Sequence, residues 1–253
     1  MTIKSYAALT TEIGSQLPDN TVGAITPSAL RTVFQDILDS ATQTVNVVQQ
    51  SFTTSGTYTP NAKMIAALLE TWGGGAGAGG AANSAIGQST GGFGGSGGYS
   101  RKLVTASAIG ASKAVTIGAF GAGGAAGNNN GTAGGDTSVG SLCIAKGGSP
   151  GVGAAANSNG AGGVGGILGT GDETQVGNTG DTGAFSSEST VVIPFGSGGW
   201  TSLGRGGLPG TAPTNANSGA GGGGGLSINN NGDQAGGNGA NGFCRITEFL
   251  GCS

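Results

Sequence analysis

The stretch MIAALLETWGGGAGAGG, residues Met64–Gly80, decides the fold. An apolar segment ends at Trp72, and a run of glycine and alanine begins at the next residue. The same change from apolar residues to glycine recurs after Phe120, Lys146 and Phe195. Near the end the order reverses, because GGNGANG leads into FCRITEFL. This repeated pattern predicts short strands joined by long glycine-rich excursions.

The composition divides the chain into two parts. Of the 59 glycines among 253 residues, only Gly14 and Gly23 precede residue 51. We therefore expect a helical module over residues 1–50 and a glycine-rich β domain over residues 51–253. Such composition is also typical of disorder. The low charge and the regularly spaced β-branched segments favour a folded domain instead.

Charge and hydropathy exclude several classes of protein. The net charge is −3 with both signs scattered, so no basic patch is expected to bind nucleic acid or an anionic membrane. No apolar run approaches the ~20 residues that cross a bilayer, so we expect no membrane insertion. The N-terminal MTIKSYAALTTEIG lacks the apolar core of a signal peptide. We expect synthesis in the cytoplasm without an export signal.

Three cysteines, Cys143, Cys244 and Cys252, form no CxxC spacing. An odd number argues against a disulfide framework, and the spacing argues against a zinc site. We expect small thiols, no metal and no cofactor.

The first fifty residues predict two helices. Ser5–Ile13 has apolar residues at helical spacing, and LPDNTVGAITP forms a turn-rich connection. Thr26 followed by Pro27 is a favourable helix start, because threonine caps free N–H groups and proline suits the first turn. From there an apolar stripe predicts an amphipathic helix of about five turns that reaches Val48.

The stripe of this helix must be buried against something. Either the Ser5–Ile13 segment folds back on it, or copies of the chain associate through a short coiled coil. We favour association. The residues expected at the interface are Leu30, Val33, Phe34, Ile37, Leu38, Ala41 and Val45.

The body of the chain predicts about seven strands. SFTTSGTYTP gives the first short ones, and Lys63–Trp72 gives a strand of about ten residues. The remaining expected strands are Ser100–Ile109, Lys113–Phe120, Thr137–Lys146, Thr190–Phe195 and Gly242–Leu250. These strands would form a small β-sheet or sandwich.

The glycine runs lack large side chains over long stretches, as in Gly73–Gly80 and Gly219–Gly225. Long loops are unusual in a compact domain, and flexible linkers usually carry serine beside glycine. Extended helices with three residues per turn are another solution, since glycine lets such backbones pack and bond to their neighbours. We therefore expect packed polyglycine-type extended helices above the sheet, at a large entropic cost.

The order of these segments resembles a known family. The motifs are SGTYTP, TWGGGAGAGG, GGYSRKLV, AVTIGAFGAGG, TSVGSLCIAKGG, GAGGGGG and GGNGANGFCRITEF. Over residues 52–250 the chain resembles the glycine-rich C-terminal domain of bacteriophage and prophage tail fibre proteins. The segment LPDNTVGAITPSALRTVFQDILDS resembles leader segments of phage virion proteins.

The resemblance implies a virion appendage, commonly a homotrimer. It would dock on other tail proteins through its N-terminal segment and recognise a bacterial surface receptor, protein or polysaccharide, through its tip. A more distant analogy is to the glycine-rich adhesins of T-even phages. No shaft of repeats separates helix and tip, which favours a short fibre or a fibre tip. A purely structural tail or head decoration, or an adaptor, is the alternative, and a glycine-rich wall or matrix protein is disfavoured.

Catalysis is not expected. The chain has no histidine, the commonest general base. Glycosidases need two opposed carboxylates, and the adjacent Asp172 and Glu173 would point apart on an extended chain. Gly-x-Gly-x-x-Gly matches occur by chance, without the βαβ context of a phosphate loop.

Candidate receptor-binding residues are large side chains that interrupt small-residue stretches. Aromatic side chains on rigid loops suit both protein and sugar surfaces, although each could instead pack inside the domain. The candidates are Trp200, Phe185, Phe93, Tyr99 and Arg205.

Overall fold

The computed structural model describes residues 6–16, 27–41, 46–186 and 196–251. The chain is mainly β, with antiparallel strand pairs. Its elements are α1 (Tyr6–Gln16), α2 (Pro27–Ala41), β1 (Asn46–Phe52), β2 (Gly56–Tyr58), β3 (Met64–Trp72), β4 (Gln88–Thr90), β5 (Tyr99–Thr105), α3 (Ala106–Ile109), β6 (Lys113–Thr116), β7 (Thr137–Val139), β8 (Cys143–Ala145), β9 (Glu173–Gln175), β10 (Leu226–Ile228) and β11 (Phe243–Leu250).

The chain divides into two compact units. One comprises Met1–Val48, Asn61–Ile65 and Glu248–Ser253, and the other comprises Gln49–Pro60 and Ala66–Thr247. The second unit holds almost all of the glycine-rich sequence, and the candidate site described below lies within it.

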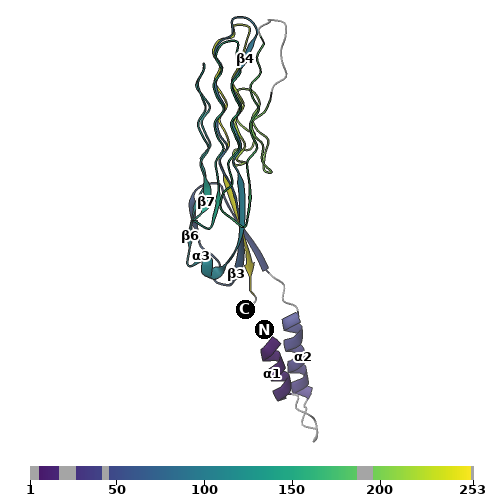
Figure 1. Ribbon diagram of the computed structural model, residues 1–253. Helices are drawn as coiled ribbons and strands as arrows, with labels where there is room; N and C mark the ends of the chain where they lie inside the picture. Colours follow the sequence, from purple (N-terminus) through teal and green to yellow (C-terminus); the bar gives the residue numbers. More distant parts are fainter. Residues whose placement is uncertain (1–5, 17–26, 42–45, 187–195, 252–253) are drawn as a thin grey trace. The chain divides into compact units, whose positions relative to one another are not determined.

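Helices α1 and α2 lie side by side in the first unit (Figure 1). Helix α2 begins at Pro27, where the sequence places a helix start, but it ends at Ala41. The prediction that it continues to Val48 is wrong, because Val48 lies in strand β1. The β-branched residues around Val47 favour an extended backbone over a further helical turn. Val45 lies outside the described residues.

The apolar stripe of α2 is only partly covered. Val33 is buried within the chain, so its assignment to an interface between copies is wrong. The pairing of α1 with α2 in one chain explains why a stripe residue needs no second copy. Leu30, Phe34 and Ile37 remain exposed. The side chains of Leu38 and Ala41 lie outside the described residues.

Within the described residues, the strands form three sheets. The five-stranded sheet has the order β1-β11-β3-β5-β9, the four-stranded sheet has the order β2-β6-β7-β8, and β10 pairs with β4. In the central pair, Trp72 of β3 lies opposite Tyr99 of β5, and Glu70 lies opposite Arg101. Strand β9 extends this face, with Gln175 opposite Tyr99 and Glu173 opposite Arg101.

Several strand boundaries differ from the sequence prediction. The segment Thr137–Lys146 forms two strands, β7 and β8, because Gly140 adopts a φ of 52° that turns the chain. The segment Ser100–Ile109 leaves the sheet after Thr105 and ends in the single turn α3. The segment Lys113–Phe120 is a strand only to Thr116. The predicted strand Thr190–Phe195 lies outside the described residues.

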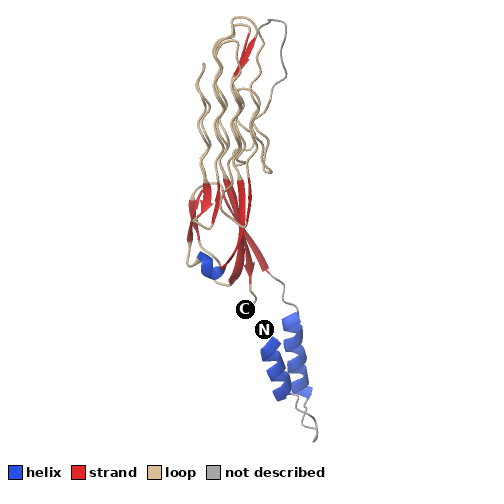
Figure 2. Cartoon of the chain, viewed as in Figure 1, coloured by secondary structure: helices blue, strands red, loops and turns tan. Residues whose placement is uncertain are grey.

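The glycine segments run side by side and extend away from the five-stranded and four-stranded sheets, as the tan traces of Figure 2 show, and strand β4 of the two-stranded sheet lies at their far end (Figure 1). The segment over residues 73–81, which follows β3 directly, donates hydrogen bonds in an order that repeats every three residues. Gly73, Ala76 and Gly79 donate to the carbonyl oxygens of Gly98, Gly95 and Gly92. Gly74, Gly77 and Gly80 donate to those of Gly135, Thr132 and Asn129. Gly75, Ala78 and Ala81 donate to those of Ala240, Gly237 and Gln234. Partner numbers fall as donor numbers rise, so these three neighbours run antiparallel.

The carbonyl groups of the same segment bond to three further neighbours. Gly74, Gly77 and Gly80 accept from the N–H groups of Gly148, Gly151 and Ala154. Gly75 and Ala78 accept from Gly121 and Gly124, and Ala76 and Gly79 accept from Gly222 and Gly225. Partner and acceptor numbers rise together, so these neighbours run parallel. The segment over residues 73–81 is therefore surrounded by hydrogen-bonded backbone.

Close backbone approach explains why these positions are glycine. A Cβ at Gly75 would overlap the carbonyl group of Ala220, and one at Gly77 would overlap that of Ala122. The alanines at positions 76, 78 and 81 are buried in the same segment. The side chains of residues 73–81 are therefore small enough for neighbouring backbones to approach and form hydrogen bonds between their amide and carbonyl groups. Buried backbone polar groups require such partners.

Candidate functional site: an aromatic groove

One face of the five-stranded sheet collects aromatic and charged side chains. Side chains two residues apart on a strand share a face. Glu70 and Trp72 of β3 therefore face the same way, and the register places Tyr99 and Arg101 of β5 beside them. Arg245 of β11 comes from the strand on the other side of β3. The sheet thus gathers residues that are up to 175 positions apart in sequence.

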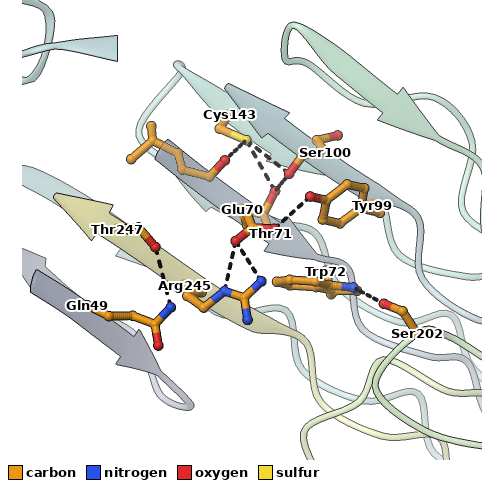
Figure 3. Close-up of polar contacts among 11 residues, drawn as sticks. Gln49, Glu70, Thr71, Trp72, Tyr99, Ser100, Cys143, Ser202, Arg245 and Thr247 are labelled. Atoms are coloured by element: carbon orange, nitrogen blue, oxygen red, sulfur yellow. Dashed lines mark hydrogen bonds and ion pairs between the residues drawn. The ribbon is translucent and has the colours of Figure 1, made fainter. Parts of the chain in front are cut away.

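Glu70 holds the centre of this face. Arg245 donates to its Oε2 from Nε at 2.8 Å and from a second guanidinium nitrogen at 2.7 Å. The hydroxyl of Tyr99 donates to its Oε1 at 2.8 Å (Figure 3). Charge-assisted hydrogen bonds of this kind are the stronger ones in proteins. They fix Glu70, Tyr99 and Arg245 in one arrangement.

Burial and the hydrogen bond to Glu70 raise the pKa of Tyr99 above its usual range. The negative charge of the Glu70 carboxylate adds to this shift, because it opposes a second negative charge on the phenol. Tyr99 is therefore a hydrogen-bond donor at neutral pH rather than an anion.

Trp72 lies at the base of the site. Its ring centroid is 4.9 Å from that of Tyr99 and 5.6 Å from that of Phe243. The guanidinium carbon of Arg245 lies 5.6 Å from the Trp72 centroid, within cation–π range. The indole N–H donates to Ser202 Oγ at 3.0 Å (Figure 3). Trp72 thereby connects the sheet to the loop that carries Trp200.

Trp200 sits on that loop with its ring exposed. Its carbonyl oxygen accepts a hydrogen bond from Asn178 Nδ2 at 2.7 Å. The N–H of the preceding Gly199 donates to Gly94 at 2.8 Å. The Trp200 side chain is 59% exposed. Its backbone is held on the glycine segments while its ring faces solvent.

These residues line a groove of about 580 Å³, which we call the aromatic groove. The volume falls within the ~300–1,000 Å³ of small-ligand sites. The lining side chains include Trp72, Tyr99, Trp200, Gln175, Val176, Asn178 and Thr201, together with the charged Glu70, Arg101, Glu173 and Arg245. Arg101 and Glu173 form a second ion pair at 2.7 Å.

Two buried thiols lie behind this face: Cys244 is on β11, and Cys143, on β8 of the four-stranded sheet, contacts Thr71 of β3. Cys143 Sγ lies 3.4 Å from Thr71 Oγ1, and Cys244 is also buried. Burial raises the pKa of Cys143 to about 11 and that of Cys244 to about 12. Both are protonated at neutral pH and inert toward nucleophilic chemistry. Cys252 lies outside the described residues.

The groove includes two of the five predicted receptor residues, Trp200 and Tyr99. Arg205 and Phe185 are exposed but do not line it. Phe93 is fully buried, so its assignment as a receptor contact is wrong. It follows two glycines that approach neighbouring backbone closely, and its ring fills space inside the domain.

Sequence reasoning missed the charged residues and Trp72. The spacings Glu70-x-Trp72 and Tyr99-x-Arg101 indicate that each pair shares one face of its strand, because alternate residues on a strand point the same way. The pairing register was needed to bring the two spacings together.

Neither a membrane span nor a metal cluster is found within the described ranges. No described helix is both long and apolar enough to cross a membrane. No group of three or more metal-binding side chains of the His, Cys, Asp and Glu types occurs among the same residues.

The fold and the groove define a mainly antiparallel β protein with a ligand-sized surface groove. No family model matches the chain, and no curated protein is significantly similar to it.

Proposed function

We propose that this chain is a bacteriophage tail fibre protein, a short fibre or fibre tip, that recognises the host cell surface without covalent chemistry. The observation that carries the proposal is the aromatic groove. Trp200 and Tyr99, chosen from the sequence as receptor contacts, both line it. Aromatic side chains beside a few oriented polar groups are the usual composition of a binding site.

A rigid support strengthens this proposal. We assign the glycine segments to polyglycine-type extended helices, because their hydrogen bonds repeat every three residues and reach several neighbours. A binding surface held on rigid elements loses little conformational entropy when a ligand binds. Such a domain would keep its groove in shape outside the cell.

The helical unit supports the second half of the proposal. Leu30, Phe34 and Ile37 of α2 leave an exposed apolar stripe that needs a partner. We propose that this stripe assembles the chain as a homotrimer or docks it on another tail protein in the virion. A purely structural virion component would use the same helices but would make no use of the groove.

Binding of purified full-length protein to intact bacteria tests the proposal. A fluorescently labelled protein is screened against a panel of species, and the strain that binds is used to compare variants. Trp200→Ala removes the exposed ring in the groove. Leu208→Ala is a matched control, since Leu208 is 63% exposed and does not line the groove.

Recognition through the groove predicts saturable binding that Trp200→Ala weakens and Leu208→Ala leaves unchanged. Equal binding by all three proteins would place recognition elsewhere on the molecule. The structural alternative predicts that the protein binds no bacterium on the panel and binds only virion proteins.

A further inference from the structure

We infer that the aromatic groove binds a neutral saccharide, with the indole face of Trp200 as the stacking surface. This inference rests on the proposed function, because it names the class of receptor that the groove would recognise. It depends on three properties of the groove: its charge balance, its exposed aromatic ring and its polar side chains.

The charge balance of the groove disfavours an ionic ligand. Its charged lining residues are two carboxylates and two guanidinium groups. They are already paired, Glu70 with Arg245 and Glu173 with Arg101, each at 2.7 Å. An anionic sugar or a phosphate would meet arginines whose charge is already balanced by a carboxylate, so its net electrostatic gain would be small. A cationic ligand would meet carboxylates whose charge is balanced in the same way.

The hydrogen bonds around Glu70 reinforce this argument. Both of its oxygens accept bonds inside the protein, from Arg245 and from Tyr99. Its side chain is only 12% exposed. The Glu70–Arg245 pair therefore stabilises the groove. A ligand would form most of its contacts with the other side chains that line the groove.

Trp200 supplies a flat apolar surface in a polar setting. The ring is exposed while its backbone is bonded to Asn178 and its loop is bonded to Trp72 through Ser202. The C–H faces of a pyranose ring match the electron-rich face of an indole, which carries a negative quadrupole. Because the loop is already held in place, stacking of a ligand on the ring costs little conformational entropy.

The neighbouring polar side chains suit hydroxyl groups. Gln175 and Asn178 carry amides, and each amide already donates one N–H inside the protein, to Glu173 and to the Trp200 carbonyl oxygen. Each amide has a second N–H to donate and an oxygen that can accept, as sugar hydroxyls require. The Thr201 hydroxyl donates to the Ser218 carbonyl oxygen, so toward a ligand it serves as an acceptor. Gln175 lies opposite Tyr99 in the sheet, so it belongs to the same face as the aromatic base. Carboxylates and ammonium groups of a peptide would find fewer matches here.

A glycan array and treated cells test the inference together. The array carries neutral oligosaccharides that end in glucose, galactose or mannose, and matched ones that end in an acidic sugar. The cells are treated with periodate, which destroys vicinal diols, or with protease. Wild type, Trp200→Ala, Trp200→Phe and the control Leu208→Ala are compared as full-length proteins.

We expect binding to neutral glycans and to cells that is lost after periodate and kept after protease. Trp200→Ala should weaken it at least about tenfold, as removal of an aromatic contact can. Trp200→Phe should keep part of the affinity, and Leu208→Ala should keep all of it. Raising salt from about 50 to about 500 mM should change the affinity less than about twofold, because no net charge is paired on binding.

Other results would separate the two proposals. Binding to cells that protease removes and periodate leaves intact would overturn the saccharide and keep surface recognition. A preference for acidic glycans, with a steep salt dependence, would overturn the charge argument. Binding to neutral glycans without binding to any cell would overturn host recognition alone. A protein that binds neither glycans nor cells would overturn both.

Discussion

Arg245 and Glu70 are joined across two neighbouring strands by contacts of 2.8 and 2.7 Å to one carboxylate oxygen. Tyr99, on the strand beyond, donates to the other oxygen at 2.8 Å. Strands β11, β3 and β5 are consecutive in the sheet, so these side chains link its three central strands. The base of the aromatic groove is therefore also a part of the sheet's stabilising structure.

Removal of the Glu70 carboxylate is expected to destabilise the protein. Glu70→Ala leaves Arg245 and Tyr99 without their acceptor in a part-buried site. We expect a loss of about 1.5–3 kcal/mol in the free energy of unfolding, the range for hydrogen bonds to charged groups. Urea denaturation measures it. Glu173→Ala is the matched control, because the side chains of Arg101 and Glu173 are 50% and 43% exposed, and it should cost at most about 1 kcal/mol.

A double variant distinguishes an interaction from general damage. If Glu70 and Arg245 act as a pair, Glu70→Ala with Arg245→Ala should cost less than the sum of the single variants. Additive losses would show that the two residues contribute independently.

Stability should fall at alkaline pH because of Tyr99. Its pKa is raised in the folded protein, so the folded state holds the phenolic proton more tightly than the unfolded state does. This contribution is fully present below the unfolded pKa of about 10 and is lost as pH rises above it. Urea denaturation between about pH 8 and about pH 11 measures the change. Tyr99→Phe should reduce the slope above about pH 10, and an unchanged slope would contradict the assignment.

Two phenylalanines that look alike in the sequence should differ in effect. Phe93 is fully buried, whereas Phe185 is 46% exposed. Phe93→Ala should cost about 3–5 kcal/mol, because it removes buried surface and leaves a cavity. Phe185→Ala should cost less than about 1 kcal/mol. Thermal unfolding of the two variants compares them directly, and equal midpoints would contradict the burial difference.

The sequence predicts strands best where an apolar run meets glycine. Strand β3 ends at Trp72 and β11 begins at Phe243, each one residue from where the glycines begin or end. The division of Thr137–Lys146 into β7 and β8 was missed, because its apolar residues continue on both sides of Gly140. A single glycine inside a strand pattern indicates either a weak point or a turn, and only the backbone conformation distinguishes them.

The groove could be predicted only in part. Trp200 and Tyr99 are large side chains among small ones, and that contrast is visible in the sequence. Glu70 and Arg245 look like isolated charges, because their meeting depends on β11 lying beside β3. Such a contact joins residues 175 positions apart, and no local pattern encodes it. Phe93 was misassigned for the same reason, since its backbone hydrogen-bond partners, Asp181 and Gly163, come from distant segments.

The exposed stripe of α2 should control assembly. Phe34→Asp places a charge among Leu30 and Ile37, so association through this stripe would become unfavourable. We expect the molar mass in light scattering to fall from that of an oligomer to that of one chain, while the unfolding of the glycine-rich unit is unchanged. Arg31→Gln is the control, because Arg31 is exposed on the polar side of the helix. A wild-type protein that is already a single chain would contradict self-association and favour docking on another virion protein.

Backbone packing of the glycine segments should tolerate no added methyl group at their centre. A Cβ at Gly75 would overlap the carbonyl group of Ala220. A hydrogen bond of 2.8 Å from Ala240 N to the Ala220 oxygen holds that carbonyl group in place. Gly75→Ala should therefore prevent folding or lower the thermal midpoint by well over 10 °C, as a loss above ~4 kcal/mol would. Gly56→Ala is the matched control: its Cβ would meet only the Phe52 ring at 3.9 Å, so stability should stay within about 1 kcal/mol of wild type. Circular dichroism melting compares the two variants, and a Gly75→Ala protein as stable as wild type would contradict the packing of residues 73–81 against their neighbours.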